Sequence, residues 1–476
     1  MTSLADRCRA GIGAAARHLS KREMVLLLFV FALALVLRVA WIAYANPSPN
    51  DGRFGDEVFY DHAGQALAAG KGFTGFADQQ TANWPPGYPA MLAVIYKVFG
   101  HHVTGAKALN AFAGAATCLL VYAVGRKVFN RRVGLIAALL LAFFPGQIYF
   151  STLVMTESVF PAIVMFILLL ALMWIVERER LSSARLFILG VLCGLAALTR
   201  SEAAVLLVAA LVVLKLVVPS WRRFARQGSL LVAGAVLIIA PWTVRNAFVM
   251  KAFIPIVSGM GHTLLSGHQD DPYNPYHVLP EAKLRIQYAY LPFPERETKV
   301  EDVALHEAIH FIVTHPAYEV QLLFEKSYHM YKDDSDALLW IRGTFFNSAD
   351  APWLVTTWFH STGEKVVTIP PAAEANWSHL ADSYYYLALL AALAGVPLWF
   401  SLKDRKRFFL VLIVLGWTGA HIMFIPSPRY HAALIPILCL WAAVPLAFAW
   451  DRLRPRPARV EITVRNDADG TQATHP

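Results

Sequence analysis

Two acidic residues, Asp56 and Glu57, stand side by side in the polar stretch that follows the first long apolar segment of the sequence. A carboxylate can accept a proton from a hydroxyl group and so act as a general base. Acidic residues also favour the first turn of a helix, where they cap it or interact with its dipole, and this is the alternative interpretation. If the apolar segment crosses a membrane, the pair lies close to lipid, where a charged group is costly. This position favours a role in chemistry.

One further acid and three arginines stand at the ends of other apolar segments. Glu157 begins one such segment, although the N-terminus of a helix would also favour an acid there. Arg200, Arg245 and Arg429 stand at segment ends where basic residues are otherwise scarce. A guanidinium group matches a phosphate with two parallel hydrogen bonds, while each arginine could instead extend its charge to the membrane surface. Three arginines at the same depth in a membrane favour a bound anionic group such as a phosphate.

These residue types permit the transfer of a sugar from a phosphate. A carboxylate would remove the proton of the acceptor hydroxyl. The arginines would stabilise the leaving phosphate as its charge develops. The sugar itself would pass through a state like an oxocarbenium ion, as it does in glycoside hydrolysis. The residues allow this reaction and do not by themselves require it.

A competing motif lies later in the chain, where His306, Glu307 and His310 match the H-E-x-x-H signature of zinc proteases. Two histidines four residues apart share one helix face, and the acid between them could activate a zinc-bound water. The extended form of the motif needs a third histidine where the chain has Pro316, and His315 would point to another face. A chain with 16 histidines produces the short motif by chance, so an amphipathic helix with exposed histidines is the preferred interpretation.

The composition indicates the elements that must position these residues. Hydrophobic residues make up 57% of the 476 residues and charged residues only 16%, against about 25% charged in a typical soluble domain. The apolar residues occur in blocks, several of them close to the roughly 20 residues that a helix needs to cross a bilayer. Only helices or closed barrels satisfy their backbone in lipid, and blocks of this length favour helices. The four cysteines suggest no disulfide framework and are interpreted as small apolar fillers.

The sequence predicts an all-α, polytopic integral membrane protein with about ten transmembrane helices and two large extracytoplasmic loops. The predicted spans are 24–45, 104–125, 133–150, 157–176, 185–199, 203–218, 229–249, 381–402, 408–425 and 431–450. The fifth and sixth spans are short and could instead form one re-entrant hairpin. The first span could be a signal peptide, but its apolar core is longer than such a peptide needs, which favours an uncleaved anchor.

Lysine and arginine set the orientation of these spans. Clusters of basic residues fall in alternate connecting segments, namely 7–22, 126–132, 178–185, 222–226, 403–407 and 452–465. The opposing short segments, 145–156 and 426–430, carry only Arg429. Since cytoplasmic segments are enriched in Lys and Arg, both termini are predicted to be cytoplasmic and the large loops extracytoplasmic. The same arrangement explains the net charge of +9 without a nucleic-acid partner.

The predicted division of the chain follows from this topology. Its parts are a cytoplasmic N-terminal segment 1–23, a first helix 24–45, a first extracytoplasmic loop with short helices 46–103, helices two to seven 104–249, a large extracytoplasmic loop 250–380, helices eight to ten 381–450 and a cytoplasmic tail 451–476. A multi-span transporter is the alternative for such a chain. Transporters usually carry charges near the middle of the bilayer and show repeated halves, neither of which is seen here.

Several short motifs occur in the order and at the topological positions of one family. They are Arg38, Gly55-Asp56-Glu57, Tyr60, the segment 66–73, Pro85-Pro86-Gly87-Tyr88-Pro89, Thr156-Glu157-Ser158, Leu198-Thr199-Arg200-Ser201-Glu202, the segment 241–246 and Pro428-Arg429-Tyr430. With these motifs the chain resembles the bacterial membrane glycosyltransferases related to dolichyl-phosphate-mannose protein mannosyltransferases (glycosyltransferase family 39) and to the aminoarabinose transferases of lipid A. These enzymes share the GT-C fold. The chain departs from the family at Gly267-His268, where Gly-Asn is common.

The resemblance implies transfer of a sugar from a polyprenyl-phosphate donor to a lipid, glycan or protein acceptor outside the cytoplasm, by an enzyme of the cell membrane. By position, Asp56 matches the acidic residue of the family's first loop, which is a base or a metal-assisting carboxylate. Some relatives use a divalent metal and others do not. The other implied site residues are Glu57 and Glu157 as supporting acids, Arg200, Arg245 and Arg429 as ligands of the carrier phosphate, and Tyr430 and Tyr60 beside them.

Overall fold

A computed structural model describes residues 20–47, 56–75, 78–177, 181–269, 279–342 and 369–453. Throughout these ranges the regular elements are helices, and an isolated bridge between Thr74 and Gln80 is the only β-type pairing among them. The predicted all-α fold is therefore confirmed. Gly55, residues 7–19 of the N-terminal basic segment and residues 454–465 of the C-terminal one lie outside the described residues.

The first helix, α2 (Lys21–Ala45), closely matches the predicted span 24–45. Ser20 caps it, since its hydroxyl accepts from the Glu23 backbone N–H while the Glu23 carboxylate reaches back to the Ser20 N–H. Glu23 also binds Tyr122 and Arg126 of a later helix, so the start of α2 is fixed to the bundle. Large apolar side chains such as Val25 and Leu28 are more than half exposed, as expected of a surface that faces lipid.

The next helices form a tightly packed hairpin. These are α5 (Val103–Val128), α6 (Arg131–Ala142), α7 (Pro145–Tyr149) and the 3-10 turn η2 (Phe150–Thr152). A Cβ atom on Gly125 would lie 2.7 Å from the Cα of Gly134, so α5 and α6 can approach this closely only because both residues are glycine. The predicted span 133–150 is bent by 57° between α6 and the α7–η2 pair. Pro145 begins α7 there, since proline suits the first turn of a helix.

A second group of apolar helices follows. It consists of α8 (Phe160–Ala171) with the π-helical turn η3 (Leu172–Val176), α9 (Ser183–Thr199), the 3-10 turn η4 (Ser201–Ala203), α10 (Ala204–Val217) and α11 (Trp221–Val249). The predicted fourth span begins too early, because α8 starts at Phe160 and Glu157 lies in the turn before it. The interruption predicted between the fifth and sixth spans is present, with α9 ending before Arg200.

The C-terminal part contains α18 (Pro371–Ala394), α19 (Val396–Trp399), α20 (Arg405–Ile422), the 3-10 turn η5 (Pro428–Ala433) and α21 (Ile435–Leu453). Three predicted boundaries differ from the helix ends here. The span predicted at 381–402 begins at Pro371 and ends before Gly395, where the chain turns into α19. The last helix begins at Ile435 and not at 431, because η5 occupies the preceding residues.

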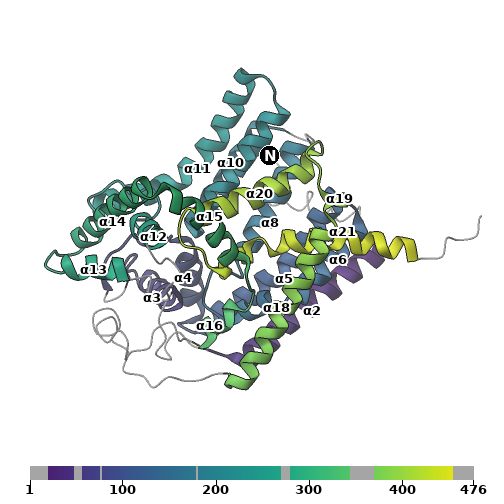
Figure 1. The fold of residues 1–476 in the computed structure, drawn as a ribbon, viewed down its shortest axis with the longest axis horizontal. Helices are drawn as coiled ribbons and strands as arrows, with labels where there is room; N and C mark the ends of the chain where they lie inside the picture. The colour runs from purple at the N-terminus through teal and green to yellow at the C-terminus, as the bar shows by residue number, and fades with distance from the viewer. Residues whose placement is uncertain are drawn as a thin grey trace, which may run out of the picture.

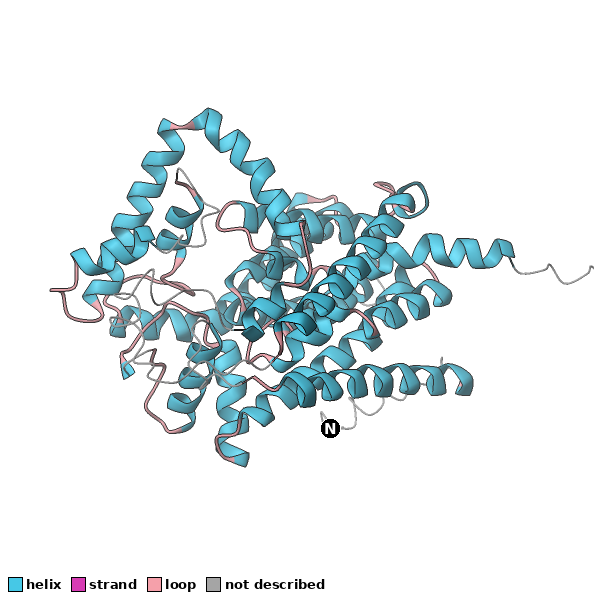
Figure 2. Ribbon diagram, turned by 60° about the horizontal axis from the view of Figure 1, so that its bottom comes forward, coloured by secondary structure: helices cyan, strands magenta, loops and turns pink. Residues whose placement is uncertain are grey.

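The remaining helices lie in the two long segments that precede α5 and follow α11. They are α3 (Asp56–Ala68), α4 (Gly87–Phe99), α12 (Met260–Gly267), α13 (Leu279–Gln287), α14 (Glu295–Thr314), α15 (Pro316–Tyr331) and α16 (Asp336–Arg342). Figure 1 shows α12, α13 and α14 grouped on the side opposite the N-terminal end of α2 and the C-terminal end of α21. Figure 2 shows the same all-helical architecture after a turn of the molecule.

The apolar helices place the protein in a membrane. Four described helices are long and apolar enough to cross one, namely α2, α5, α11 and α21, and the bent α6–α7 pair would make a fifth. Several other apolar helices are shorter, with 10–17 residues. The total of about ten spans and the orientation of the termini remain predictions from sequence.

Candidate active site

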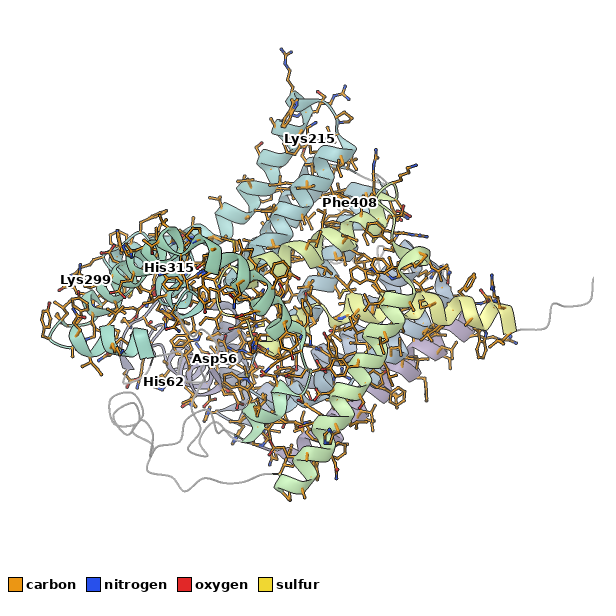
Figure 3. All side chains as sticks on the ribbon, viewed as in Figure 1. Asp56, His62, Lys215, Lys299, His315 and Phe408 are labelled. Atoms are coloured by element: carbon orange, nitrogen blue, oxygen red, sulfur yellow. The ribbon has the colours of Figure 1, made fainter. Side chains whose placement is uncertain are left out.

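Asp56 and Arg429 form an ion pair although 373 positions separate them in the sequence. Asp56 is the first residue of α3, and Arg429 lies on η5. The Arg429 guanidinium donates to Oδ2 of Asp56 at 2.6 Å, and the Trp84 indole N–H donates to Oδ1 at 3.3 Å. Both carboxylate oxygens of Asp56 thus bind side chains of other elements. In Figure 3, Asp56 lies far from Lys215 and Phe408, two residues near helix ends that are predicted to be cytoplasmic.

A second ion pair joins Glu157 and Arg200. One Arg200 nitrogen donates at 3.0 Å to Oε1 of Glu157 and also at 3.0 Å to the Thr156 hydroxyl. The other terminal nitrogen of Arg200 lies 3.7 Å from Oε1 of Glu202. Glu157 is buried in the turn before α8, so it serves this cluster and does not stand in the first turn of the helix. The turn at the end of α9 supplies the arginine.

Tyr430 connects the two pairs. Its ring lies 5.4 Å from the guanidinium carbon of Arg200 and 5.1 Å from that of Arg429. Arg429 also stacks over the Trp340 ring at 4.4 Å. Such cation–π contacts are stronger where water is excluded. The rings therefore fix both guanidinium groups in direction while leaving their charge available to an anion.

Tyr60 completes the cluster from α3. It follows Asp56 by four residues, so both side chains lie on one face of the helix. Burial raises the pKa of Tyr60 well above its usual value, and the nearby Asp56 carboxylate raises it further, against the opposing effect of Arg200. Its hydroxyl therefore stays protonated and can donate a hydrogen bond within the cluster.

The two arginines remain charged despite their burial. Burial disfavours the charge of Arg429, but Asp56 and the other groups nearby hold its pKa well above the usual range. For Arg200, burial is likewise outweighed by the carboxylates of Glu202 and Glu157, and its pKa rises. Fixed charges in a site from which water is largely excluded interact more strongly than they would in water. The arrangement can therefore stabilise a developing negative charge.

Two predicted site residues have other contacts. The Glu57 carboxylate accepts from the Val154 backbone N–H at 2.7 Å and is buried, which holds α3 against the 153–155 segment. The structure does not bring Arg245 to the cluster. Its guanidinium donates to the backbone oxygens of Thr81 and Phe73 at 2.7 and 3.0 Å and to the Gln80 side chain at 2.6 Å. Arg245 thus anchors the loop that precedes Trp84.

Three residues of the candidate site were not predicted from the sequence. Trp84 binds Asp56, Trp340 stacks on Arg429, and Asp336 accepts from the Trp340 indole at 3.0 Å. Burial raises the pKa of Asp336 to about 6, against the opposing effect of Arg429. The only sequence signal for it was the acidic run from Asp333 to Asp336 in the long loop. The tryptophans gave no signal, since their role depends on the fold.

The carboxylates of the site do not fit a divalent metal as they stand. Among the described residues, no group of three or more His, Cys, Asp or Glu side chains is arranged to hold a metal ion. Asp56 and Glu157 each face a guanidinium group, which a cation would have to displace. Hard cations need several oxygen ligands around them.

The H-E-x-x-H motif lies on α14, and its histidines point to the surface. The His306 side chain is 76% exposed, and its Nδ1 lies 2.7 Å from the Asp302 backbone oxygen. The His315 ring stacks on Phe311 with ring centres 4.4 Å apart. Within the described part of the chain, no third ligand joins the pair, although the motif lines an open hollow together with Leu265 and His268.

Comparisons with known proteins agree with the predicted resemblance. Residues 83–244 match the family model described as dolichyl-phosphate-mannose-protein mannosyltransferase. No curated protein sequence matches the chain significantly. Among solved structures, the apo oligosaccharyltransferase of Archaeoglobus fulgidus is similar, with a TM-score of 0.50 and 14% identity over 90% of this chain and 51% of that one.

Two further structures have lower scores. ArnT from Cupriavidus metallidurans bound to undecaprenyl phosphate has a TM-score of 0.39 and 15% identity, over 89% of this chain and 79% of that one. The Archaeoglobus fulgidus enzyme AglB with an inhibitory peptide and a dolichol-phosphate has a TM-score of 0.48 and 16% identity, over 91% and 51%. The chain spans about half the length of the archaeal enzymes. The match to the apo archaeal structure shows a shared fold.

Proposed function

We propose that this protein is a membrane glycosyltransferase that moves a sugar from a polyprenyl-phosphate-linked donor to an acceptor on the extracytoplasmic side. The observation that carries the proposal is the convergence of the Asp56–Arg429 ion pair with a second pair formed by Arg200. The family model that matches part of the chain is named for a donor of this kind, in which mannose is linked to dolichyl phosphate. The transferred group is a hexose or a pentose, and the acceptor is a lipid, a glycan or a protein.

Asp56 is the base in this proposal. Its carboxylate takes the proton of the acceptor hydroxyl while the hydroxyl oxygen attacks the anomeric carbon of the sugar. The bond between that carbon and the phosphate oxygen breaks, and its electron pair stays on the phosphate. The polyprenyl phosphate leaves with one more negative charge, and the proton passes from Asp56 to solvent. No step needs an additional reactant.

The leaving phosphate is stabilised by the two guanidinium groups. The guanidinium carbons of Arg429 and Arg200 lie 5.1 and 5.4 Å from the centre of the Tyr430 ring, so two positive charges meet around this one ring. A fixed positive charge aimed at the leaving group lowers the barrier because it costs no reorganisation during the reaction. The buried Tyr60 hydroxyl is a further donor at the same place. The membrane supplies the donor, since a polyprenyl chain dissolves in lipid.

The test uses the full-length protein in lipid nanodiscs. Synthetic polyprenyl phosphates that carry mannose, glucose, galactose or arabinose are supplied with membrane lipids, envelope glycans and envelope proteins, and products are identified by mass spectrometry. We expect transfer from at least one donor, with release of polyprenyl phosphate. Asp56→Asn should lower this transfer by about 100-fold or more, because an amide cannot serve as the base.

The matched control is Asp302→Asn, which changes an exposed carboxylate on α14 and should leave transfer unchanged. Near-normal turnover in the Asp56→Asn protein would remove Asp56 from the mechanism. Absence of transfer with every donor, together with movement of a labelled solute into liposomes, would instead favour a transporter.

A further inference from the structure

A polar group lies next to the proposed phosphate site and is not used by the reaction described above. Glu202 stands between Arg200 and His421, with its Oε1 atom 3.7 Å from an Arg200 nitrogen and 3.6 Å from Nε2 of His421. The His421 side chain is 2% exposed, whereas that of Glu202 is 27% exposed. A ligand could therefore reach the group along the edge of Glu202.

The backbone of α20 fixes the tautomer of His421. Its Nδ1 lies 2.9 Å from the Trp417 carbonyl oxygen, and a carbonyl can only accept, so Nδ1 carries the proton. In the neutral ring Nε2 is then an acceptor. This atom is buried and has no hydrogen-bond partner among the described residues. The ring itself is held between Trp417 and Tyr430, each with its ring centre 4.7 Å away.

Arg200 contributes the complementary atom. Its terminal nitrogens contact Glu157, Thr156 and Glu202, but its Nε–H is buried and lacks a hydrogen-bond partner in the described part of the chain. A buried polar atom without a partner is costly, so native proteins usually provide one. The unmatched donor and the unmatched acceptor thus belong to two residues that both lie beside the Glu202 carboxylate. A hydroxyl group both donates and accepts, and so it can satisfy the two atoms together.

We propose that His421, Glu202 and Arg200 form a hydroxyl-binding subsite that recognises one hydroxyl group of the transferred sugar. The inference rests on the proposed glycosyl transfer and assigns a specificity role to His421. The hydroxyl donates to Nε2 of His421 and accepts from the Arg200 Nε–H. Because Arg200 also binds Glu157, the recognised hydroxyl belongs to the sugar at the reacting centre. The substrate is therefore a sugar that carries a free hydroxyl at this position.

The test combines variants with altered donors. The best donor of the panel and its monodeoxy analogues, each lacking one hydroxyl, are compared by kcat/KM in wild-type protein and in His421→Phe, which keeps a ring of similar shape. In the wild type, removal of one particular hydroxyl should lower kcat/KM by about 10- to 100-fold, since the buried polar atoms are left without a partner. His421→Phe should lower kcat/KM for the complete donor by a similar factor and abolish most of the penalty for that analogue alone.

Two further proteins keep the test decisive. Glu202→Gln preserves the shape of the side chain but removes the negative charge beside Arg200 and His421, so it should reduce the loss of kcat/KM caused by the missing hydroxyl. His306→Phe, which alters an exposed histidine on α14, should behave as wild type. An equal loss of kcat/KM for all donors in both His421→Phe and Glu202→Gln would assign these residues a structural role only and overturn the inference. Equal use of every monodeoxy donor by the wild type would also overturn it. Absence of transfer from every donor would instead refute the proposed function on which the subsite depends.

Discussion

At the scale of single residues, the proposed mechanism makes the Asp56–Arg429 pair a link between donor binding and activation of the acceptor. While Arg429 donates to Asp56 at 2.6 Å, the carboxylate is bound to a cation. A phosphate that binds Arg429 competes for the same donors, because guanidinium groups bind carboxylates and phosphates alike. In the proposed mechanism, donor binding therefore releases Asp56 to accept a proton. This coupling favours binding of the donor before the acceptor is activated.

Asp336 provides a prediction for the pH dependence of stability. Burial raises its pKa to about 6 in the folded protein, above the usual value of 3.8 for an aspartic acid. An acid with a raised pKa contributes stability below its unfolded pKa and loses that contribution as the pH rises through about 6. We expect Asp336→Asn, which cannot ionise, to stabilise the protein by about 3 kcal/mol at pH 8 and by about half as much at pH 5.

The measurement is the thermal unfolding midpoint of detergent-solubilised protein at both pH values. Asp302→Asn, at an exposed position on α14, is the control. A stability difference between Asp336→Asn and wild type that is the same at pH 5 and pH 8 would contradict the assigned pKa.

At the scale of elements, two helices hold the loop that carries Trp84 to Asp56. Arg245 of α11 binds this loop from one side. Glu297 of α14 accepts from the Thr81 hydroxyl at 2.7 Å and the Ala82 N–H at 3.0 Å, and also from the Ser258 hydroxyl at 2.5 Å. The helix with the H-E-x-x-H motif thus acts on the site through its buried face. Its exposed histidines lie on another face.

Glu297→Gln should loosen this loop. An amide offers one acceptor oxygen where the carboxylate has two, so the three hydrogen bonds that Glu297 accepts cannot all be kept as they are. We expect faster hydrogen exchange in residues 78–84 and a rise in KM with a smaller change in kcat. The matched variant Glu307→Gln changes an exposed acid of the same helix and should alter neither. If Glu307→Gln abolished activity while Glu297→Gln did not, a role for the H-E-x-x-H motif would have to be reconsidered.

At the scale of the whole molecule, the sequence predicted the helical class and most apolar helices. Long apolar blocks show where a helix lies in lipid, but its ends depend on local turns. The helix predicted at 381–402 instead begins at Pro371 and ends before Gly395. The last helix, α21, begins later than predicted because the 3-10 turn η5 precedes it. Turn geometry of this kind has a weaker sequence signal than hydrophobicity.

The candidate site likewise combines residues that the sequence indicates with contacts that only the fold creates. Charged residues at the ends of apolar segments were visible in the sequence, and Asp56, Glu157, Arg200 and Arg429 do converge in the structure. Arg245 has the same sequence context but binds loop backbone, a difference that depends on tertiary contacts. The contacts of Trp84, Trp340 and His421 were likewise invisible, because each depends on elements distant in the sequence.

The most direct test of the account is a crosslink between the two ends of the first ion pair. In a protein whose native cysteines are replaced, the double substitution Asp56→Cys and Arg429→Cys should be crosslinked by a short bifunctional thiol reagent. The single Cys variants should be labelled by a membrane-impermeant reagent from the extracytoplasmic side only. Absence of a crosslink, with labelling of the two positions from opposite sides of the membrane, would contradict a shared active site.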